Sequence, residues 1–486
     1  GANNTALGYN SLGATTTGAS NTALGFGSMN TNTTGENNTA SGRNSLYFNT
    51  TGSENVAVGQ QALLNNTTGS SSTSVGYQAA YTNTTGQNEA FGYQAAYSNT
   101  TGNYNQAFGY QALNSNTTGS YNIAIGRGAV QLNTTGSNNV GVGFQALVAN
   151  TTASDNTAVG YQALLSNTTG TANTAIGKRA LQDSTTGGDN TAVGVSAMLE
   201  NTTGSSNSAF GVLAMDDNTT GDTNTALGAS ALRRNTTASY NTAVGYQAAF
   251  SNTTASFNTS VGYQSLYTIT TNGSNTALGY QAGYSATNVE NTFIGFKSGY
   301  GVTTGASGTG VGRFSLGGNS AGLTGSNNVS IGNAAMYVNT SGADNVAVGT
   351  LALFDNTTGS NSVAIGKDSL QNNTTASNNV AVGYQSLFDN TTGSSNVSLG
   401  YRSAYNNTTG GSNTAVGYQS YYLATTAAQN TVMGYNSGYN ISTGNDNAFF
   451  GNDSGHKNTT GANNTAVGSD ALRANTTADN NNALGM

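Results

Sequence analysis

The sequence predicts an all-β protein, a parallel β-solenoid (β-roll) of about 28 turns. One glycine recurs from Gly8 to Gly485 at a regular spacing, which is 17 in 25 intervals, 16 in two and 20 in one. A short fixed period is typical of proteins in which each copy is one small unit stacked on its neighbours. The segment before each glycine is short and rich in β-branched residues, and Asn, Thr and Gly follow it. These residues favour short strands joined by turns.

Each copy follows the pattern Asn-Thr-Ala-Val-Gly-Tyr-Gln-Ala-Leu-x-x-Asn-Thr-Thr-Gly-x-x, and its positions are counted from the recurring glycine, the anchor, as position 0. Position −1 is apolar in 28 of 29 copies and position +4 is usually Leu or Met, so we predict that both rows form the core. The anchor is never replaced, which predicts a positive φ or a close approach of another backbone. The anchors that we single out are Gly59, Gly76, Gly92, Gly109, Gly126, Gly143 and Gly160.

Position +3 is Ala or Ser in all 28 copies, which indicates that a neighbouring backbone passes close by. We predict a homotrimer in which these small residues lie where chains or strands approach closely. The members that we single out are Ala62, Ala79, Ala112, Ala146 and Ala163.

Two further positions vary in an informative way. The glycine at +10 is replaced by Ala in six copies, Ala153 among them, so this position requires a small residue rather than a special φ. Where the side chain at +4 shrinks, +5 is aromatic, as in Ala80–Tyr81 and Gly283–Tyr284, and we expect the ring to fill the space that the smaller residue leaves.

Composition narrows the function classes. Only 6% of residues are charged, the net charge is −7 and no basic stripe is present, which argues against nucleic-acid binding. No run of eighteen apolar residues is present, so we expect no membrane-spanning segment. The repeat predicts a single continuous domain over 1–486, with an irregular segment at 279–332 and a bulge or bend near Gly317–Asn319. Both ends lie inside the repeat, so we expect the chain to be an excerpt of a longer fibre.

The repeat resembles two known families. Asn55–Gly59 and Ser362–Gly366, which read Asn-Val-Ala-Val-Gly and Ser-Val-Ala-Ile-Gly, resemble the head repeat of trimeric autotransporter adhesins of the YadA type. This resemblance implies a left-handed parallel β-roll, three chains wide. The fuller pattern over Asn156–Gly170 is similar to repeat regions of tail-fibre-like proteins. The period of this chain is longer than the usual period of the adhesin heads.

The sequence gives no indication of catalysis, a cofactor or a metal centre. Its one histidine, His456, occupies the +5 position that Tyr or Phe fills elsewhere, so we interpret it as an aromatic filler. No His–carboxylate or cysteine-based catalytic group can be assembled. Asp453 and Asp470 each lie at +2, where they could contact a cation from neighbouring turns, but a metal site is the weaker interpretation. We therefore predict that the chain is not an enzyme.

Position +1 is the candidate binding surface, because it carries Tyr in 12 copies and also accepts Arg and Lys, which indicates exposure. A stacked tyrosine row could bind glycans or surfaces, although axial stacking that stiffens the fold is the stronger interpretation. Most copies also contain an Asn-x-Thr glycosylation sequon, for which turn chemistry is the better explanation. The tyrosines of the candidate row include Tyr77, Tyr93, Tyr110, Tyr161, Tyr246 and Tyr263.

These observations favour a structural function: the shaft of an extracellular, cell-surface or virion fibre that supplies reach, stiffness and multivalent display. At ~4.8 Å a turn, 28 turns predict a length of roughly 130–140 Å. The expected partners are further copies of the chain, in a homotrimer or filament. The alternative is an adhesin that binds cell-surface glycans through the repeat face. A third possibility is ice binding by the threonine ladders.

Overall fold

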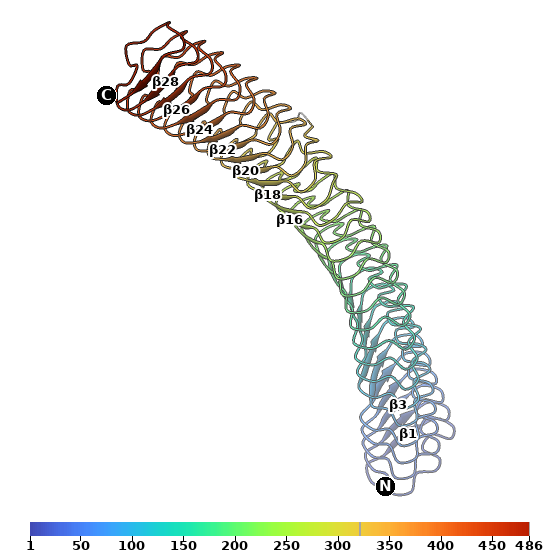
Figure 1. Ribbon diagram of the computed structural model, residues 1–486. Helices are drawn as coiled ribbons and strands as arrows, with labels where there is room; N and C mark the ends of the chain where they lie inside the picture. Colours follow the sequence, from blue (N-terminus) through green and yellow to red (C-terminus); the bar gives the residue numbers. More distant parts are fainter. Residues whose placement is uncertain (320–321, 486) are drawn as a thin grey trace. The chain divides into compact units, whose positions relative to one another are not determined.

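The computed structural model describes residues 1–319 and 322–485, and it confirms the parallel β-solenoid of about 28 turns with the predicted period. The chain forms two compact units, residues 1–240 and 241–486, which are described separately below. Figure 1 shows that within each unit the chain winds in successive stacked turns, each with a short strand. Handedness, a trimer and a single continuous domain stay predictions.

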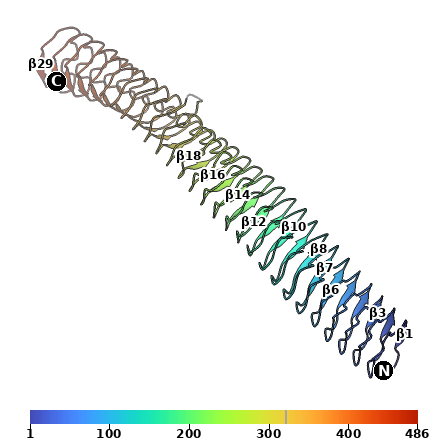
Figure 2. The ribbon, with the colours of Figure 1, turned by 90° about the vertical axis from the view of Figure 1, so that its right-hand side faces the viewer.

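The first unit contains strands β1 to β14, each paired in parallel with the next. Figure 2 shows these strands side by side along one face of the unit. The strands are β1 Thr5–Leu7, β2 Thr22–Leu24, β3 Thr39–Ser41, β4 Val56–Val58, β5 Thr73–Val75, β6 Asn88–Phe91, β7 Asn105–Phe108, β8 Ile123–Ile125, β9 Val140–Val142, β10 Thr157–Val159, β11 Thr174–Ile176, β12 Thr191–Val193, β13 Ser208–Phe210 and β14 Thr225–Leu227.

The second unit contains β15 to β29, paired in the same way. The strands are β15 Thr242–Val244, β16 Thr259–Val261, β17 Thr276–Leu278, β18 Thr292–Ile294, β19 Thr309–Val311, β20 Val329–Ile331, β21 Val346–Val348, β22 Val363–Ile365, β23 Val380–Val382, β24 Val397–Leu399, β25 Thr414–Val416, β26 Thr431–Met433, β27 Ala448–Phe450, β28 Thr465–Val467 and β29 Asn482–Leu484.

The irregular segment keeps its strand register. Strands β17 to β20 pair at equivalent positions in spite of the shorter and longer intervals between their anchors. The extra residues of the long interval therefore lie in the connection after Leu316, where Val302 and Leu323 form an isolated parallel bridge. The predicted bulge near Gly317–Asn319 borders residues 320–321, which lie outside the described residues, and it stays a prediction.

The anchor glycines have the backbone conformation that the sequence predicts. Their φ values lie between 126° and 143°, except for 105° at Gly485. A Cβ added at Gly160 would also lie 2.5 Å from the carbonyl oxygen of Gly177, the anchor of the next turn. Both predicted reasons for glycine therefore apply together: a φ that L side chains rarely adopt, and contact with the backbone of the adjacent turn.

The core is built from small residues at −2 and +3 and from the large residue at +4. In the turn of Gly160 these are Ala158, Ala163 and Leu164, and all three side chains are fully buried. Leu164 adopts a φ of 51°, and most other residues at +4 share this left-handed conformation. A leucine in that conformation is strained by roughly 1–3 kcal/mol, so burial of its side chain must offset a backbone cost in almost every turn.

The prediction that rings at +5 fill the space left by a small residue at +4 is wrong where +4 is glycine. Phe293 and Phe449, both at −2, are fully buried and fill that space instead. A Cβ added at Gly299 would lie 2.2 Å from the ring of Phe293, and one at Gly455 would lie 2.3 Å from the ring of Phe449. A strand residue that points inward reaches the vacant volume directly, whereas the side chain at +5 leaves the turn on its outer side.

Candidate functional site: exposed rows along the turns

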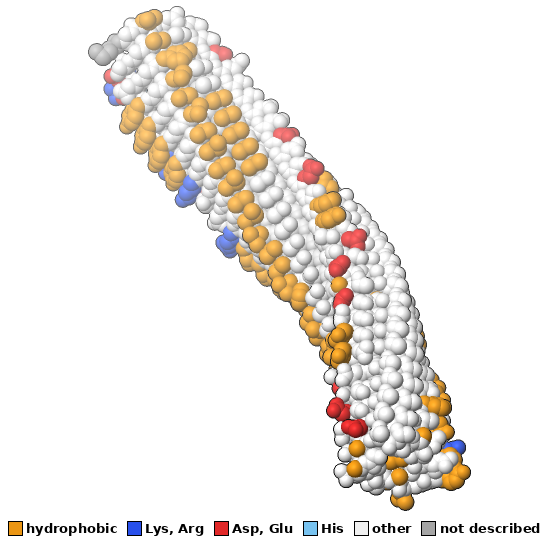
Figure 3. Space-filling view, turned by 90° about the horizontal axis from the view of Figure 1, so that it is seen from below, with side chains coloured by type: hydrophobic (Ala, Val, Ile, Leu, Met, Phe, Trp, Pro, Cys, Tyr) orange, Lys and Arg blue, Asp and Glu red, His pale blue; other side chains and the backbone are white. Residues whose placement is uncertain are grey.

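A partly exposed aliphatic and aromatic row lies at position −1 in each unit. Leu24, Val58, Ile125 and Ile176 are 37–42% exposed, although the apolar pattern predicts that their position forms the core. Figure 3 shows hydrophobic side chains gathered in rows that follow the stacked turns, with polar surface between them. The prediction that position −1 forms the core is therefore wrong, and the prediction for +4 is confirmed.

The physical reason is strand alternation. Most strands have three residues, and the middle one, at −2, points into the solenoid, as the buried Ala57 and Ala158 show. Neighbouring side chains on a strand point to opposite faces, so −3 and −1 must point outward. The sequence does indicate which strand position points inward, because the residues at −2 are small in most turns. A crowded interior is what excludes larger side chains from such a position.

The Ala/Ser row at +3 lies inside its own chain. Ala62, Ala79, Ala112, Ala146 and Ala163 are all fully buried in the single chain. Serine at this position faces position −2 of the next turn, as the hydrogen bond from the Ser386 Oγ to the carbonyl of Ser398 shows (3.0 Å). The close approach of strands is confirmed, but these residues cannot contact a second chain, because their own turns cover them.

The tyrosines at +1 form exposed stacks. Tyr77, Tyr93 and Tyr110 are 40–47% exposed and stack face to face, with ring centroids 5.3 and 5.0 Å apart. Tyr161 belongs to another stretch and stacks on Phe144 at 5.4 Å. In the second unit, Tyr246 and Tyr263 stack at 5.4 Å, and the row continues to Tyr280 and Phe296. The predicted site residues are thus exposed, in three separate stretches.

This geometry limits what the tyrosine row can bind. Inside a stack both faces of each ring lie against neighbouring rings, so solvent reaches mainly the ring edges. Sugar rings usually pack on aromatic faces, which here are free only where a stack ends. The geometry agrees with the axial stacking that the sequence favours, in which each pair contributes about 0.5–1.5 kcal/mol.

A second aromatic row, at +5, lies at the surface, and its side chains are half-buried. Phe388, Tyr405, Tyr422 and Tyr439 stack in order at 5.0–5.2 Å, and His456 continues the stack at 5.1 Å from Tyr439. Burial raises the pKa of several of these tyrosines, including Tyr405 and Tyr439. His456 therefore takes the place of a Tyr or Phe ring in this row, although Phe449 and not His456 fills the space beside Gly455.

The asparagine of the recurring Asn-Thr-Thr sequon lies inside the fold. Asn66 is fully buried, and its Nδ2 donates to the Oδ1 of Asn49 and to the carbonyl of Gly69, both at 2.9 Å. The same ladder repeats through most turns, so the Asn-x-Thr pattern here is turn chemistry, as predicted. A folded turn offers no amide nitrogen at this position for N-glycosylation.

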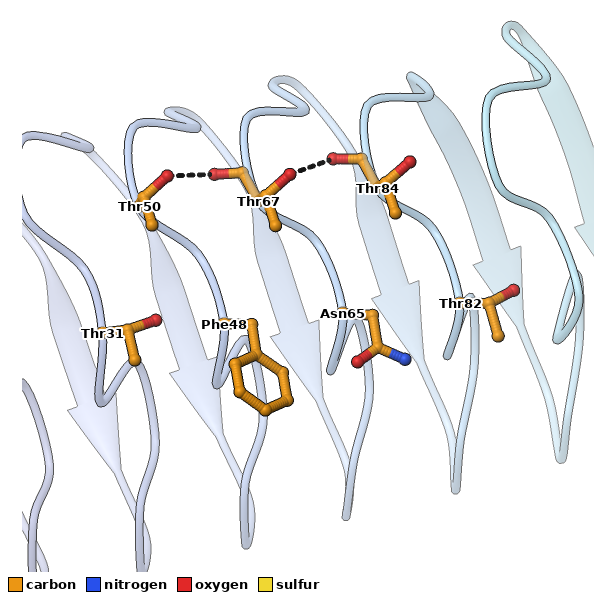
Figure 4. Close-up of a pocket in the computed structure, with 7 residues that line it drawn as sticks. All are labelled: Thr31, Phe48, Thr50, Asn65, Thr67, Thr82 and Thr84. Carbon is orange, nitrogen blue, oxygen red and sulfur yellow. Dashed lines mark hydrogen bonds between the residues drawn. The ribbon is translucent and has the colours of Figure 1, made fainter.

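The first threonine after each of these asparagines joins a second ladder. Thr50 Oγ1 donates to the carbonyl of Thr67, and Thr67 Oγ1 donates to that of Thr84, at 3.0 and 3.3 Å. Figure 4 shows this row beside Thr31, Phe48, Asn65 and Thr82, which line a shallow groove of about 620 Å³. Because the neighbouring side chains differ in size and polarity, this surface is not a flat threonine array.

The acidic residues considered as cation ligands have a protein cation instead. Arg473 lies 3.8 Å from Asp453 and 3.1 Å from Asp470, and His456 Nδ1 lies 3.2 Å from Asp453. Among the described residues, no three His, Asp or Glu side chains form a group that could hold a metal ion. Residues 1–319 and 322–485 likewise contain no helix with the length and apolarity needed to cross a bilayer.

Asp216 is an acidic residue at position +5, and its side chain is largely buried. Burial is the main cause that raises the pKa of its carboxyl from 3.8 to about 6, and Asp217 and Glu200 raise it further. Arg233, 3.6 Å away, opposes this shift without cancelling it. Sequence reasoning missed this group because acidic residues at +5 and +6 look like ordinary surface charge.

We expect the turns around Asp216 to become less stable as pH rises. The folded state binds the proton more tightly than the unfolded chain, so this contribution is full below about pH 4 and is lost through pH 6. The difference is on the order of 1–3 kcal/mol. Hydrogen exchange at pH 4.5 and pH 7.5 should show this loss in the wild type, and Asp216→Asn should abolish it. An unchanged pH dependence in Asp216→Asn would contradict the assignment.

The fold is typical of structural repeat proteins. No family model matches the chain, and no curated protein matches its sequence significantly.

Proposed function

We propose that the chain is the structural shaft of an extracellular or virion fibre, and that its exposed −1 row is where further copies of the chain assemble. As a shaft, the chain would provide reach, stiffness and repeated display rather than catalysis. The observation that carries it is the apolar −1 row, which recurs in 28 of 29 copies and faces solvent in the single chain. Contiguous exposed apolar surface of this kind is typical of an interaction site.

The area of the row supports self-association. Complete burial of a Val, Leu or Ile side chain contributes ~1.5–3 kcal/mol. At ~25 cal/mol for each Å², this energy corresponds to ~60–120 Å² of apolar surface for each side chain. In the first unit the −1 side chain is 36–71% exposed in eight of the fourteen turns and less exposed in the others, so these eight present on the order of 200–400 Å². Because a standard interface buries ~800 Å² per partner, the row of one unit supplies part of it, and the −3 row, which faces outward on the same strands, can add to it.

The periodicity supports an identical partner. A second copy repeats the same side chains at the same strand spacing of ~4.8 Å, so two or three such faces can pack in register over many turns. The resemblance to trimeric adhesin heads gives three chains as the expected number. The strand face is also poor in charge, which removes the desolvation cost that charged side chains would add to burial.

Replacement of row residues by lysine should prevent assembly. We expect Val58→Lys/Ile125→Lys/Ile176→Lys to be monomeric in analytical ultracentrifugation, with the wild type sedimenting as an oligomer, because three charges would have to be buried at the interface. The matched control is Thr68→Lys/Thr118→Lys/Thr135→Lys, in which exposed threonines at +9 receive the same charges and assembly should persist. A monomeric wild type, or loss of assembly in both variants, would reject the proposed interface.

An adhesive surface is the second candidate, and the exposed aromatic rows are the observation that favours it. Stacking leaves only ring edges and stack ends available, so any glycan contact would be confined to breaks in the rows. A glycan array with the assembled protein separates the candidates, because a shaft gives no selective signal. Ice binding is less well supported, because the threonine row lies beside a groove with uneven side chains.

A further inference from the structure

A small niche in the first unit interrupts a row of glutamines that runs from Gln61 to Gln162. Glutamine side chains at +2 form a ladder in which each Nε2 donates to the Oε1 of the preceding turn, as from Gln94 to Gln78 (2.9 Å) and from Gln111 to Gln94 (3.2 Å). The next turn carries Gly128 at this position. The missing side chain leaves a cavity of about 150 Å³, which is lined by Tyr110, Gln111, Arg127, Gly128, Gln131, Phe144 and Gln145.

The niche is open, although glycine at +2 does not always leave an open space in this chain. The only other glycine there is Gly27, where an added Cβ would lie 2.5 Å from Asn44 Oδ1 and 3.2 Å from Tyr47 Cε2, so neighbours already fill the gap. At Gly128 the nearest atoms to an added Cβ are Gln131 Oε1 at 3.3 Å and Gln145 Cγ at 3.7 Å. The second gap therefore has room for a side chain or a ligand.

The break leaves hydrogen-bonding groups unused at the niche. Gln145 has lost the glutamine to which its Nε2 would donate, and this nitrogen has no acceptor among the described residues, while its Oε1 accepts from Gln162 at 3.1 Å. Gln131 partly replaces the missing side chain by donating to Gln111 Oε1 at 3.2 Å. Its own Oε1 accepts no hydrogen bond from the described part of the chain, so the niche offers one amide donor and one amide acceptor.

Arg127 adds a positive charge without an acidic partner. Its guanidinium lies over the ring of Tyr110 at 5.5 Å and near that of Phe144 at 6.0 Å, and none of its N–H groups is hydrogen-bonded within the described residues. It is the only charged residue between Glu89 and Asp155 in the sequence. A guanidinium held between two rings presents its planar edge, which matches a carboxylate bidentately.

We propose that this niche binds the carboxylate and a neighbouring hydroxyl of an acidic sugar residue. Arg127 and the amide nitrogen of Gln145 would bind the carboxylate, and Gln131 Oε1 would accept from the hydroxyl. Arg127 lies over the rings of Tyr110 and Phe144, so only the edges of these rings would border the sugar, and the polar groups would carry the binding. The volume suits one sugar residue rather than a drug-sized molecule, for which pockets are ~300–1,000 Å³. The site lies beside the −1 row and does not depend on self-association.

The test uses methyl β-glucuronide as the probe, with methyl β-glucoside and acetate as comparison ligands, in titrations of the full chain at physiological salt followed by ligand-observed NMR. We expect saturable binding of the glucuronide and at least about tenfold weaker binding of both others, a difference of about 1.4 kcal/mol. Acetate binding as tightly as the glucuronide would overturn the sugar assignment, and absence of saturable glucuronide binding would overturn the site.

The decisive variant is Gly128→Gln, which gives this turn the residue found in most neighbouring turns. Gly128 has a φ of 64° and glutamines at +2 adopt 48–60°, so the variant should fold normally and fill the niche. We expect affinity for the glucuronide to fall at least tenfold while the sedimentation coefficient stays unchanged, which separates this site from assembly. Arg127→Tyr should have the same effect, and Arg43→Tyr, at an equivalent position elsewhere, should have none. Equal binding by wild type and Gly128→Gln would overturn the proposal.

Discussion

Gly160→Ala should destabilise its turn by about 2–6 kcal/mol, because two costs add. The φ of 138° is one that a residue with a Cβ rarely adopts, at roughly 1–3 kcal/mol. The new methyl would also lie 2.5 Å from the carbonyl oxygen of Gly177, and relief of such overpacking costs a further ~1–3 kcal/mol. Backbone cannot move aside as a flexible side chain can, because the adjacent turn is held by its own ladder of hydrogen bonds.

The matched control is Gly170→Ala at position +10. The φ of Gly170 is not in the left-handed region, although an added Cβ would lie 2.2 Å from the carbonyl of Gly187. Six copies carry Ala here, and Ala153 is accommodated in a buried position, so a small backbone shift suffices and about 1 kcal/mol is expected. Hydrogen exchange should increase over one or two turns around residue 160, because turns contact only their neighbours. Equal damage from both variants would contradict the distinction between the two glycines.

The sequence predicted the repeat, the strand segments and the anchor glycines because each depends on local geometry that recurs 28 times. It failed for the row at −1. Apolar character predicts burial, but in a three-residue strand such as Val56–Val58 the inward position is the middle one, which is Ala57. A solenoid this thin has little interior, so alanine fills the core and the larger aliphatic residues remain outside.

Contacts between residues that are not adjacent in sequence were the other limit. The aromatic residue at +5 is next to +4 in sequence and was the expected filler, whereas the structure fills the space with Phe293 from a different segment of the turn. Similarly, an alignment of repeats shows that only Gly27 and Gly128 interrupt position +2 with glycine. Only the side chains of adjacent turns show that one gap is filled and the other is open.

The compensation between −2 and +4 gives the second large effect. Phe449→Ala should cost about 3–5 kcal/mol, because it removes a fully buried ring from a site where Gly455 supplies no side chain. Gly455→Leu alone should also be strongly destabilising, since its Cβ would lie 2.3 Å from that ring.

The double variant Phe449→Ala/Gly455→Leu should recover most of the loss, because it recreates the Ala and Leu pair of ordinary turns such as Ala158 and Leu164. The φ of 60° at Gly455 is close to the 51° of Leu164, so the new leucine finds the backbone that this position normally has. A double-mutant cycle from chemical denaturation, with hydrogen exchange over the same turn, should therefore show a large favourable coupling between two substitutions that are each harmful. Additive losses would mean that the two positions do not share one volume. They would also remove the reason for glycine at +4 wherever phenylalanine stands at −2.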